Sequence, residues 1–125
     1  MGKTNAKGLQ RLINATKYSL AGFVAAWKNE EAVRQEVILS AIMIPLGLWL
    51  GETATQKALL AGACLIVLIT EMLNSAIEAI VDRIGEEHHP LSGQAKDIGS
   101  TAVFVSLCLT VLVWGLIAYE RFSSG

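Results

Sequence analysis

Carboxylate, amide and hydroxyl side chains recur on one face of a predicted helix that begins at Glu71. If each residue turns the helix by 100°, four later polar residues lie within about 60° of Glu71: Asn74, Ser75, Glu78 and Asp82. The opposite face is apolar and carries Leu73, Ile77 and Ile80. Acids this close cannot all stay ionised without a nearby cation, so the stripe predicts metal-assisted chemistry.

Glu71 directly follows an apolar stretch, residues 58–70, which places an acid at membrane depth. An ionised side chain at the centre of a bilayer costs about 2.5–3.5 kcal/mol on insertion scales, so such an acid is a functional candidate. Glu78 lies two turns later, about 10 Å nearer the water. Oxygen ligands suit Mg²⁺, and no Cys or paired-His spacing indicates zinc. The structural alternative is a Glu71 that only hydrogen-bonds Asn or Ser on another helix.

Three apolar segments must position these residues. The chain has 125 residues, 53% of them hydrophobic, and Ile98–Tyr119 is long enough to cross a membrane without a charge. Residues 37–51 and 58–70 are shorter, and the second becomes a span if it continues through the polar-striped helix. We expect one all-α membrane domain, residues 1–125, with helices over about 6–28, 33–51, 57–84 and 96–120.

The basic residues predict the orientation of these spans. Net charge is −1, which gives no global field that would attract nucleic acid. Six basic residues precede the first span, and Arg83 and Lys96 lie between the second and third, whereas only Lys57 and Arg121 lie on the other side. The positive-inside rule therefore places the N-terminus and the 82–97 loop in the cytoplasm.

The segment before the first span predicts an amphipathic helix in the cytoplasmic interface. Its apolar residues share one direction on a helical wheel: Leu9, Leu12, Ile13, Leu20, Phe23, Val24 and Trp27. On the polar face, Arg11 and Tyr18 are nearly in line, so a guanidinium and a phenol could grip phosphate and stack on a base. The alternative is two solvated side chains.

Several other groups have a structural interpretation. A charged collar opens the first span, and most of it is expected to be hydrated: Glu30, Glu31, Arg34, Gln35 and Glu36. Aromatic anchors are expected at the far interface: Trp49, Trp114 and Tyr119. His88 and His89 are expected to be exposed in a loop, and Lys96 and Asp97 to open the third span.

Longer motifs resemble the small integral-membrane prokaryotic diacylglycerol kinase family. They are ExLNSAIExxVDR at 71–83, LSGxAKDxGSxAV at 91–103 and AAWxNExAxRQE at 25–36. The resemblance implies an ATP-dependent lipid kinase in the bacterial cytoplasmic membrane, with three transmembrane helices and a surface helix per subunit. It also implies a homotrimer whose active sites are shared between subunits.

Matching positions imply roles for individual residues. Glu71 would take the proton from the lipid hydroxyl, and Glu30 and Glu78 would hold Mg²⁺ on the phosphates of ATP. Asn74 and Asp82 would support that site. The nucleotide site would be lined by Arg11, Tyr18, Glu30, Glu78, Glu87, His88, His89, Lys96 and Asp97. The lipid would be bordered by Arg11, Trp27, Glu71 and Ser100. The chain departs from enterobacterial members at Asn14 and Val24, where those members have basic residues.

Three functions fit this set of residues. The first is phosphorylation of diacylglycerol by MgATP to give phosphatidate. The second is the same chemistry on undecaprenol, a polyisoprenoid alcohol. The third is a non-enzymatic, ion-conducting bundle whose intramembrane acids relay protons or cations. A conducting bundle would explain Glu71 but would leave Arg11, Tyr18 and the charged loop without a role.

Overall fold

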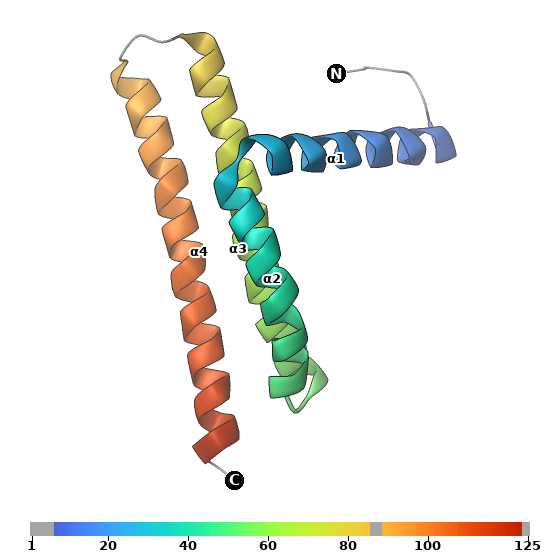
Figure 1. Cartoon of the computed structure of the whole chain (residues 1–125), viewed down its shortest axis with the longest axis vertical. Helices are drawn as coiled ribbons and strands as arrows, with labels where there is room; N and C mark the ends of the chain where they lie inside the picture. Colours follow the sequence, from blue (N-terminus) through green and yellow to red (C-terminus); the bar gives the residue numbers. More distant parts are fainter. Residues whose placement is uncertain (1–6, 86–88, 124–125) are drawn as a thin grey trace.

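Four helices follow one another along the chain, and three of them lie side by side (Figure 1). The structure is a computed structural model that describes residues 7–85 and 89–123. Helix α1 (Leu9–Asn29) lies across the others, while α2 (Glu31–Leu50), α3 (Ala54–Ile84) and α4 (Pro90–Ser123) form a bundle. The described residues contain no strand, so the predicted all-helical fold is confirmed.

Helices α2, α3 and α4 are each long and apolar enough to cross a membrane, as predicted. At 1.5 Å per residue, α2 is about 30 Å long and matches the hydrocarbon thickness, whereas α3 and α4 reach about 46 and 51 Å. The two longer helices can therefore project beyond the membrane. Figure 1 shows them extending past α1 at the end where α3 leads to α4.

The largest difference from the sequence prediction is the start of α4, at Pro90 rather than near residue 96. Proline suits a first helical position because its missing N–H would have no partner there. The ring Nδ1 of His89 accepts a hydrogen bond from the Leu91 backbone N–H (3.1 Å), which caps this end. The segment between the helices is thus shorter than the predicted 82–97 loop, and Lys96 and Asp97 lie within α4.

The bundle core lies toward the end where α2 turns into α3. Its buried members are Leu50, Leu60 and Ile117. Trp114 packs against them, and its Nε1 donates a hydrogen bond to the Leu60 carbonyl oxygen (3.1 Å). Gly47 permits this packing, because a Cβ there would lie 3.2 Å from the Trp114 ring. The prediction that Trp114 is an interfacial anchor is therefore wrong.

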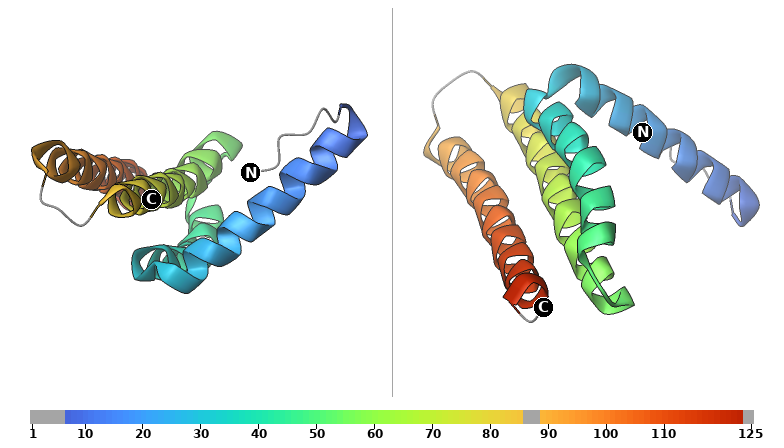
Figure 2. Two further views of the ribbon diagram at one scale, coloured as in Figure 1. Left: turned by 90° about the horizontal axis from the view of Figure 1, so that it is seen from above. Right: turned by 60° about the horizontal axis from the view of Figure 1, so that its bottom comes forward.

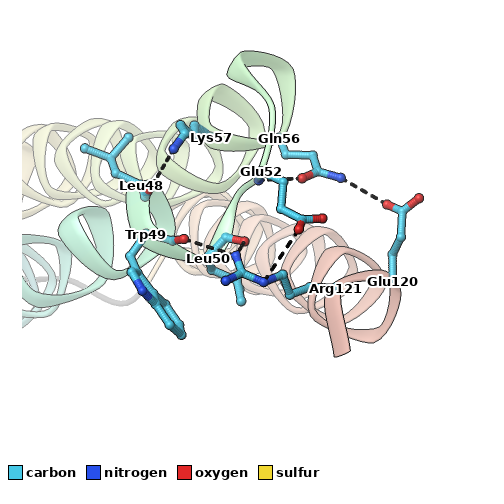
Figure 3. Close-up of polar contacts among 8 residues, drawn as sticks. All are labelled: Leu48, Trp49, Leu50, Glu52, Gln56, Lys57, Glu120 and Arg121. Atoms are coloured by element: carbon cyan, nitrogen blue, oxygen red, sulfur yellow. Dashed lines mark hydrogen bonds and ion pairs between the residues drawn. The ribbon is translucent and has the colours of Figure 1, made fainter. Parts of the chain in front are cut away.

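Polar contacts join all three bundle helices at the α2–α3 turn, and we call them the far-end cluster (Figure 3). Arg121, near the end of α4, donates from Nη1 to the carbonyl oxygens of Trp49 (3.2 Å) and Leu50 (2.7 Å). Its guanidinium also lies 3.9 Å from the Glu52 carboxylate and 5.1 Å from the Trp49 ring centre. One side chain therefore ties the end of α4 to the last turn of α2.

Two residues of α3 complete the far-end cluster. The Lys57 ammonium donates to the Leu48 carbonyl oxygen (2.9 Å). The Gln56 side chain accepts from the Glu52 backbone N–H (2.7 Å) and donates to Glu120 (3.1 Å). Backbone groups that the helix ends leave without intrahelical partners are thus satisfied by side chains.

Helix α1 differs from the bundle helices because none of its residues is buried. Figure 2 shows from two further directions that it runs away from the bundle. Near its carboxyl end the rings of Phe23 and Trp27 stack, with centres 6.4 Å apart. Only this end of α1 is close to the bundle, so only this end can contribute to a site within one chain.

Candidate active site

The polar face of α3 points into the protein, and its apolar face points outward. Glu71, Asn74 and Glu78 are half-buried, whereas Leu73 and Ile80 are 62% and 61% exposed. This arrangement suits a membrane helix, because lipid covers the apolar side and neighbouring helices cover the polar side. The polar stripe seen in the sequence therefore forms an inward surface from Glu71 to Glu78, whereas Asp82 is exposed.

If the hydrocarbon core spans α2, Glu71 lies near one edge of that core rather than at its centre. It is about 26 Å along α3 from Ala54, and the hydrocarbon core is about 30 Å thick. Because α2 runs antiparallel to α3 between the same two levels, Glu71 is level with the start of α2. The insertion cost that applies at the bilayer centre is lower there. An acid at that level would lie where a lipid headgroup meets water.

Glu30 forms the elbow between α1 and α2. It ends one helix and begins the next, with an extended backbone (φ −125°, ψ 109°). Its N–H donates to the Ala26 carbonyl oxygen (2.9 Å), and its own carbonyl oxygen accepts from the Arg34 N–H (3.2 Å). The Glu30 side chain is half-buried, and its charge acts on Glu71. The elbow therefore brings an acid from another helix toward the polar face of α3.

Glu36 is a further acid near the start of α2, and the prediction that it is hydrated is wrong. Only 8% of Glu36 is exposed, and its carboxylate accepts a hydrogen bond from the Ser40 hydroxyl (3.2 Å). The charge of Glu71 acts on Glu36 across the α2–α3 contact. The sequence held a signal for it, because Glu36 falls in helical register with the other buried residues of α2: Val33, Ser40, Gly47 and Leu50.

The acids at the elbow lack cationic partners within the part of the chain that the structure describes. Neither Glu30 nor Glu71 is in an ion pair with a described residue, and the charge of Glu78 also acts on Glu71. No group of three or more His, Cys, Asp or Glu side chains among residues 7–85 and 89–123 is close enough to hold a metal ion. Mg²⁺ needs no such cage, because it binds through one or two carboxylates, waters and substrate phosphates. The donors therefore fit Mg²⁺ better than zinc.

Asn74 lies between the acids and α4. Its amide Nδ2 donates to the Glu78 carboxylate (3.4 Å), while its Oδ1 is buried without a hydrogen-bond partner among the described residues. Gly99 of α4 packs directly against this amide, because a Cβ at Gly99 would collide with the Asn74 oxygen. A close approach of α4 to α3 thus depends on a residue without a side chain.

Lys96 brings a cationic side chain near these acids. Its ammonium pairs with the Asp82 carboxylate of α3 (2.8 Å). The charge of Glu78 also acts on Lys96. Both partners of the ion pair are well exposed, at 44% for Lys96 and 67% for Asp82. A phosphate group could therefore reach Lys96 from the water.

A cleft of about 510 Å³ lies between the carboxyl end of α1 and α3. Its walls are mostly small or apolar: Gly22, Phe23, Ala25, Ala26, Met72, Ala76 and Ala79. Polar groups line the rest: Ser19, Asn29, Glu30 and Ser75. Glu71 does not line the cleft, but its neighbour Met72 does. The cleft therefore offers an apolar space beside the acids.

The other predicted site residues are not all brought together within one chain. Arg11 lies in the first turn of α1, about 28 Å along the helix from Glu30, and Tyr18 about 18 Å from it. Asp97 and Ser100 are exposed on α4, and Trp27 is 37% exposed near the elbow. His89 caps α4. Glu87 and His88 lie outside the described residues.

Known proteins resemble this chain over most of its length. Residues 17–118 match the family described as prokaryotic diacylglycerol kinase. A diacylglycerol kinase of Haemophilus influenzae is 53% identical over 112 residues, which cover 90% of this chain and 95% of the relative. Diacylglycerol kinases of Pseudomonas aeruginosa and Escherichia coli are 51% and 44% identical, over 88% and 94% of this chain and 89% and 97% of the relatives. The resemblance found in the motifs is confirmed, and the chain belongs to the prokaryotic diacylglycerol kinase family.

Proposed function

We propose that this protein transfers the γ-phosphoryl group of ATP to the free hydroxyl of diacylglycerol, giving phosphatidate and ADP. Its relatives carry the name diacylglycerol kinase. The observation that carries the proposal is the inward polar face of α3, which holds Glu71 without an ion-pair partner among described residues at the membrane edge. The hydroxyl of diacylglycerol lies at the same depth.

In this reaction the lipid oxygen forms a bond to the γ-phosphorus as the bond from that phosphorus to its bridging oxygen breaks. Glu71 accepts the proton that the hydroxyl releases, and ADP leaves with the bridging oxygen. Phosphoryl transfer depends mainly on positioning and on neutralising charge. Glu71 supplies the positioning, because its carboxylate is level with the lipid headgroup and is carried by a helix rather than by a flexible loop.

Glu30 and Glu78 are the residues that would hold Mg²⁺. Bound there with ATP, Mg²⁺ would neutralise charge on the phosphate oxygens. The hydrogen bond from Asn74 orients the Glu78 carboxylate for this role. Lys96 binds a phosphate when it exchanges Asp82 for the nucleotide.

The cleft between α1 and α3 takes the lipid, because its small and apolar walls accept an acyl chain. Ser75 and Glu30 line the same cleft with polar groups that can face the lipid headgroup. Trp27 and Ser100 border the lipid, and α1 lies on the membrane surface with its apolar face in the headgroup region. Arg11 is too far along α1 to reach the acids of its own chain, which favours a homotrimer with sites shared between copies. The elbow and the α3–α4 turn face the cytoplasm.

Undecaprenol is the alternative substrate, because the apolar walls of the cleft suit a polyisoprenoid alcohol as well as an acyl chain. Both alcohols would present a hydroxyl to Glu71 at the interface. Membership of a kinase family favours either lipid over an ion-conducting bundle.

The test is transfer of ³²P from MgATP to diacylglycerol and, in parallel, to undecaprenol in mixed micelles. We expect fast labelling of diacylglycerol and a fall of about 100- to 10,000-fold in Glu71→Gln, the range that a general base contributes. Nucleotide binding should survive in that variant. Glu31→Gln is the matched control, since Glu31 is exposed and, among the described residues, its carboxylate accepts a hydrogen bond from Gln35 alone. Preferential labelling of undecaprenol would move the proposal to that lipid, and no labelling of either would overturn it.

A further inference from the structure

The elbow between α1 and α2 is closed by one side chain, Arg34. Its Nη1 donates hydrogen bonds to the carbonyl oxygens of Trp27 (2.6 Å) and Lys28 (3.2 Å), in the last turn of α1. The Arg34 backbone N–H donates to the Glu30 carbonyl oxygen (3.2 Å). That backbone bond is the first helical bond of α2, so the Arg34 side chain is what joins α2 to the last turn of α1.

These contacts are stronger than those of an ordinary helix cap. A charged donor roughly doubles the strength of a hydrogen bond, and a cation at the carboxyl end of a helix also interacts favourably with the helix dipole. Without Arg34, two carbonyls that have no intrahelical donor would rely on water alone. The direction in which α1 leaves α2 therefore depends on this guanidinium.

Glu30 is the single residue between the two helices, so the bend angle decides where its carboxylate lies. Arg34 forms no ion pair with a described acid, and its guanidinium donates to backbone carbonyl oxygens instead. It thus fixes the backbone around Glu30 and leaves the carboxylate available to a cation.

We propose that Arg34 is a positioning residue that holds the Glu30 carboxylate toward Glu71 and Glu78 by closing the elbow. The inference rests on the proposed role of Glu30 in binding Mg²⁺. Arginine suits this task because one planar group reaches two carbonyls at fixed angles, which a flexible ammonium does less well.

The experiment compares Arg34→Gln, Arg34→Lys and Glu30→Gln in the full-length protein in detergent. The first measurement is the Mg²⁺ concentration that gives half-maximal phosphorylation of diacylglycerol at saturating ATP. Loss of a residue that orients a metal ligand costs about 10- to 100-fold in metal affinity, so we expect Arg34→Gln to raise this concentration by that factor. Excess Mg²⁺ should restore much of the maximal rate in Arg34→Gln. Arg34→Lys should lie between Arg34→Gln and the parent protein.

The second measurement needs neither metal nor nucleotide. Hydrogen exchange of backbone amides, followed by mass spectrometry, should be faster at residues 26–36 in Arg34→Gln, because the elbow opens. Amides in the middle of α3 should keep their protection. If Arg34→Gln does not fold, Arg34→Lys gives the same two readouts with smaller shifts.

The matched control is Arg121→Gln, whose guanidinium also serves two helix-end carbonyls but lies in the far-end cluster. This variant should leave the Mg²⁺ dependence unchanged. The positioning role alone would be overturned if the half-maximal Mg²⁺ concentration is unchanged in both Arg34 variants but is raised in Glu30→Gln. An unchanged dependence in Glu30→Gln would instead overturn the proposed metal role of Glu30, and faster exchange at the elbow would then report only a structural clamp.

Discussion

At each end of the bundle, an arginine donates from one nitrogen to two carbonyl oxygens at the end of a helix. Arg34 reaches back six and seven residues to close the elbow, whereas Arg121 reaches 71 and 72 residues back to join α4 to α2. The same hydrogen-bonding device therefore shapes a bend at one end and joins two helices that are distant in the sequence at the other.

The two ends differ in what happens to their acids. In the far-end cluster, Glu52 lies beside Arg121 and Glu120 accepts from Gln56. At the elbow, Glu30 and Glu71 have no ion-pair partner among the described residues, although burial makes an unpaired charge expensive. Polar groups that are satisfied within the chain hold the fold, and acids left unpaired in a semi-buried site indicate function.

This difference can be tested by exchanging one carboxylate for an amide at each end. The change at the elbow end should have the largest effect. Glu78→Gln should lower kcat/KM for MgATP about 100-fold or more, because Glu78 would hold the Mg²⁺ that neutralises charge on the phosphates. The unfolding temperature should hold or rise, since the repulsion between Glu78 and Glu71 is relieved. Steady-state phosphorylation kinetics and thermal unfolding in detergent measure the two quantities.

Glu52→Gln is the matched change at the far end. Its carboxylate is 58% exposed and 3.9 Å from Arg121, so the variant should lose less than about 1 kcal/mol of stability and keep its kinetics. The comparison fails if Glu78→Gln loses activity only in proportion to folded protein, or if Glu52→Gln loses activity as well.

The sequence was sufficient to predict the side of α3 that carries the site. The spacing of Glu71 and Glu78 against Leu73 and Ile80 predicts two faces, and lipid leaves only one way to orient them. The three apolar segments were predicted for the same reason, since the membrane imposes a length and a composition that can be read locally.

The sequence was not sufficient where residues depend on partners distant along the chain. Glu36 looked like part of a hydrated collar because its burial depends on packing against α3, and Trp114 looked like an anchor because Gly47 lies on another helix. The predicted start of α4 near residue 96 is too late, because a proline such as Pro90 can begin a helix as well as end a loop. The elbow clamp of Arg34 depends on a bend angle that no local pattern encodes.

A second comparison separates the two arginines. Arg121→Gln should lower the free energy of unfolding by about 1–3 kcal/mol, because two helix-end carbonyls lose a charged donor and Trp49 loses the guanidinium above its ring. The rate of phosphorylation per folded molecule should not change. Denaturant or thermal unfolding in detergent measures the first quantity, and a phosphorylation assay on the folded fraction measures the second.

An Arg121→Gln variant with normal stability would show that water replaces the guanidinium at little cost, and the far-end cluster would then not be what locks the helices. A variant that keeps its fold but loses activity would place a functional role at the wrong end of the molecule. Either outcome would remove the contrast between the two clamps.

The smallest expected effect concerns the ion pair at the site end. Asp82→Asn removes the partner of Lys96, but both side chains are well exposed, so the free energy of unfolding should hardly change. Since MgATP no longer competes with Asp82 for the ammonium, KM for MgATP should fall, by about two- to threefold at low salt. The change should shrink at about 1 M salt, where charges are screened within about 3 Å. A KM that rises instead would show that Asp82 supports the nucleotide directly. Glu31 is another exposed acid at this end, so Glu31→Gln controls for the loss of one negative charge.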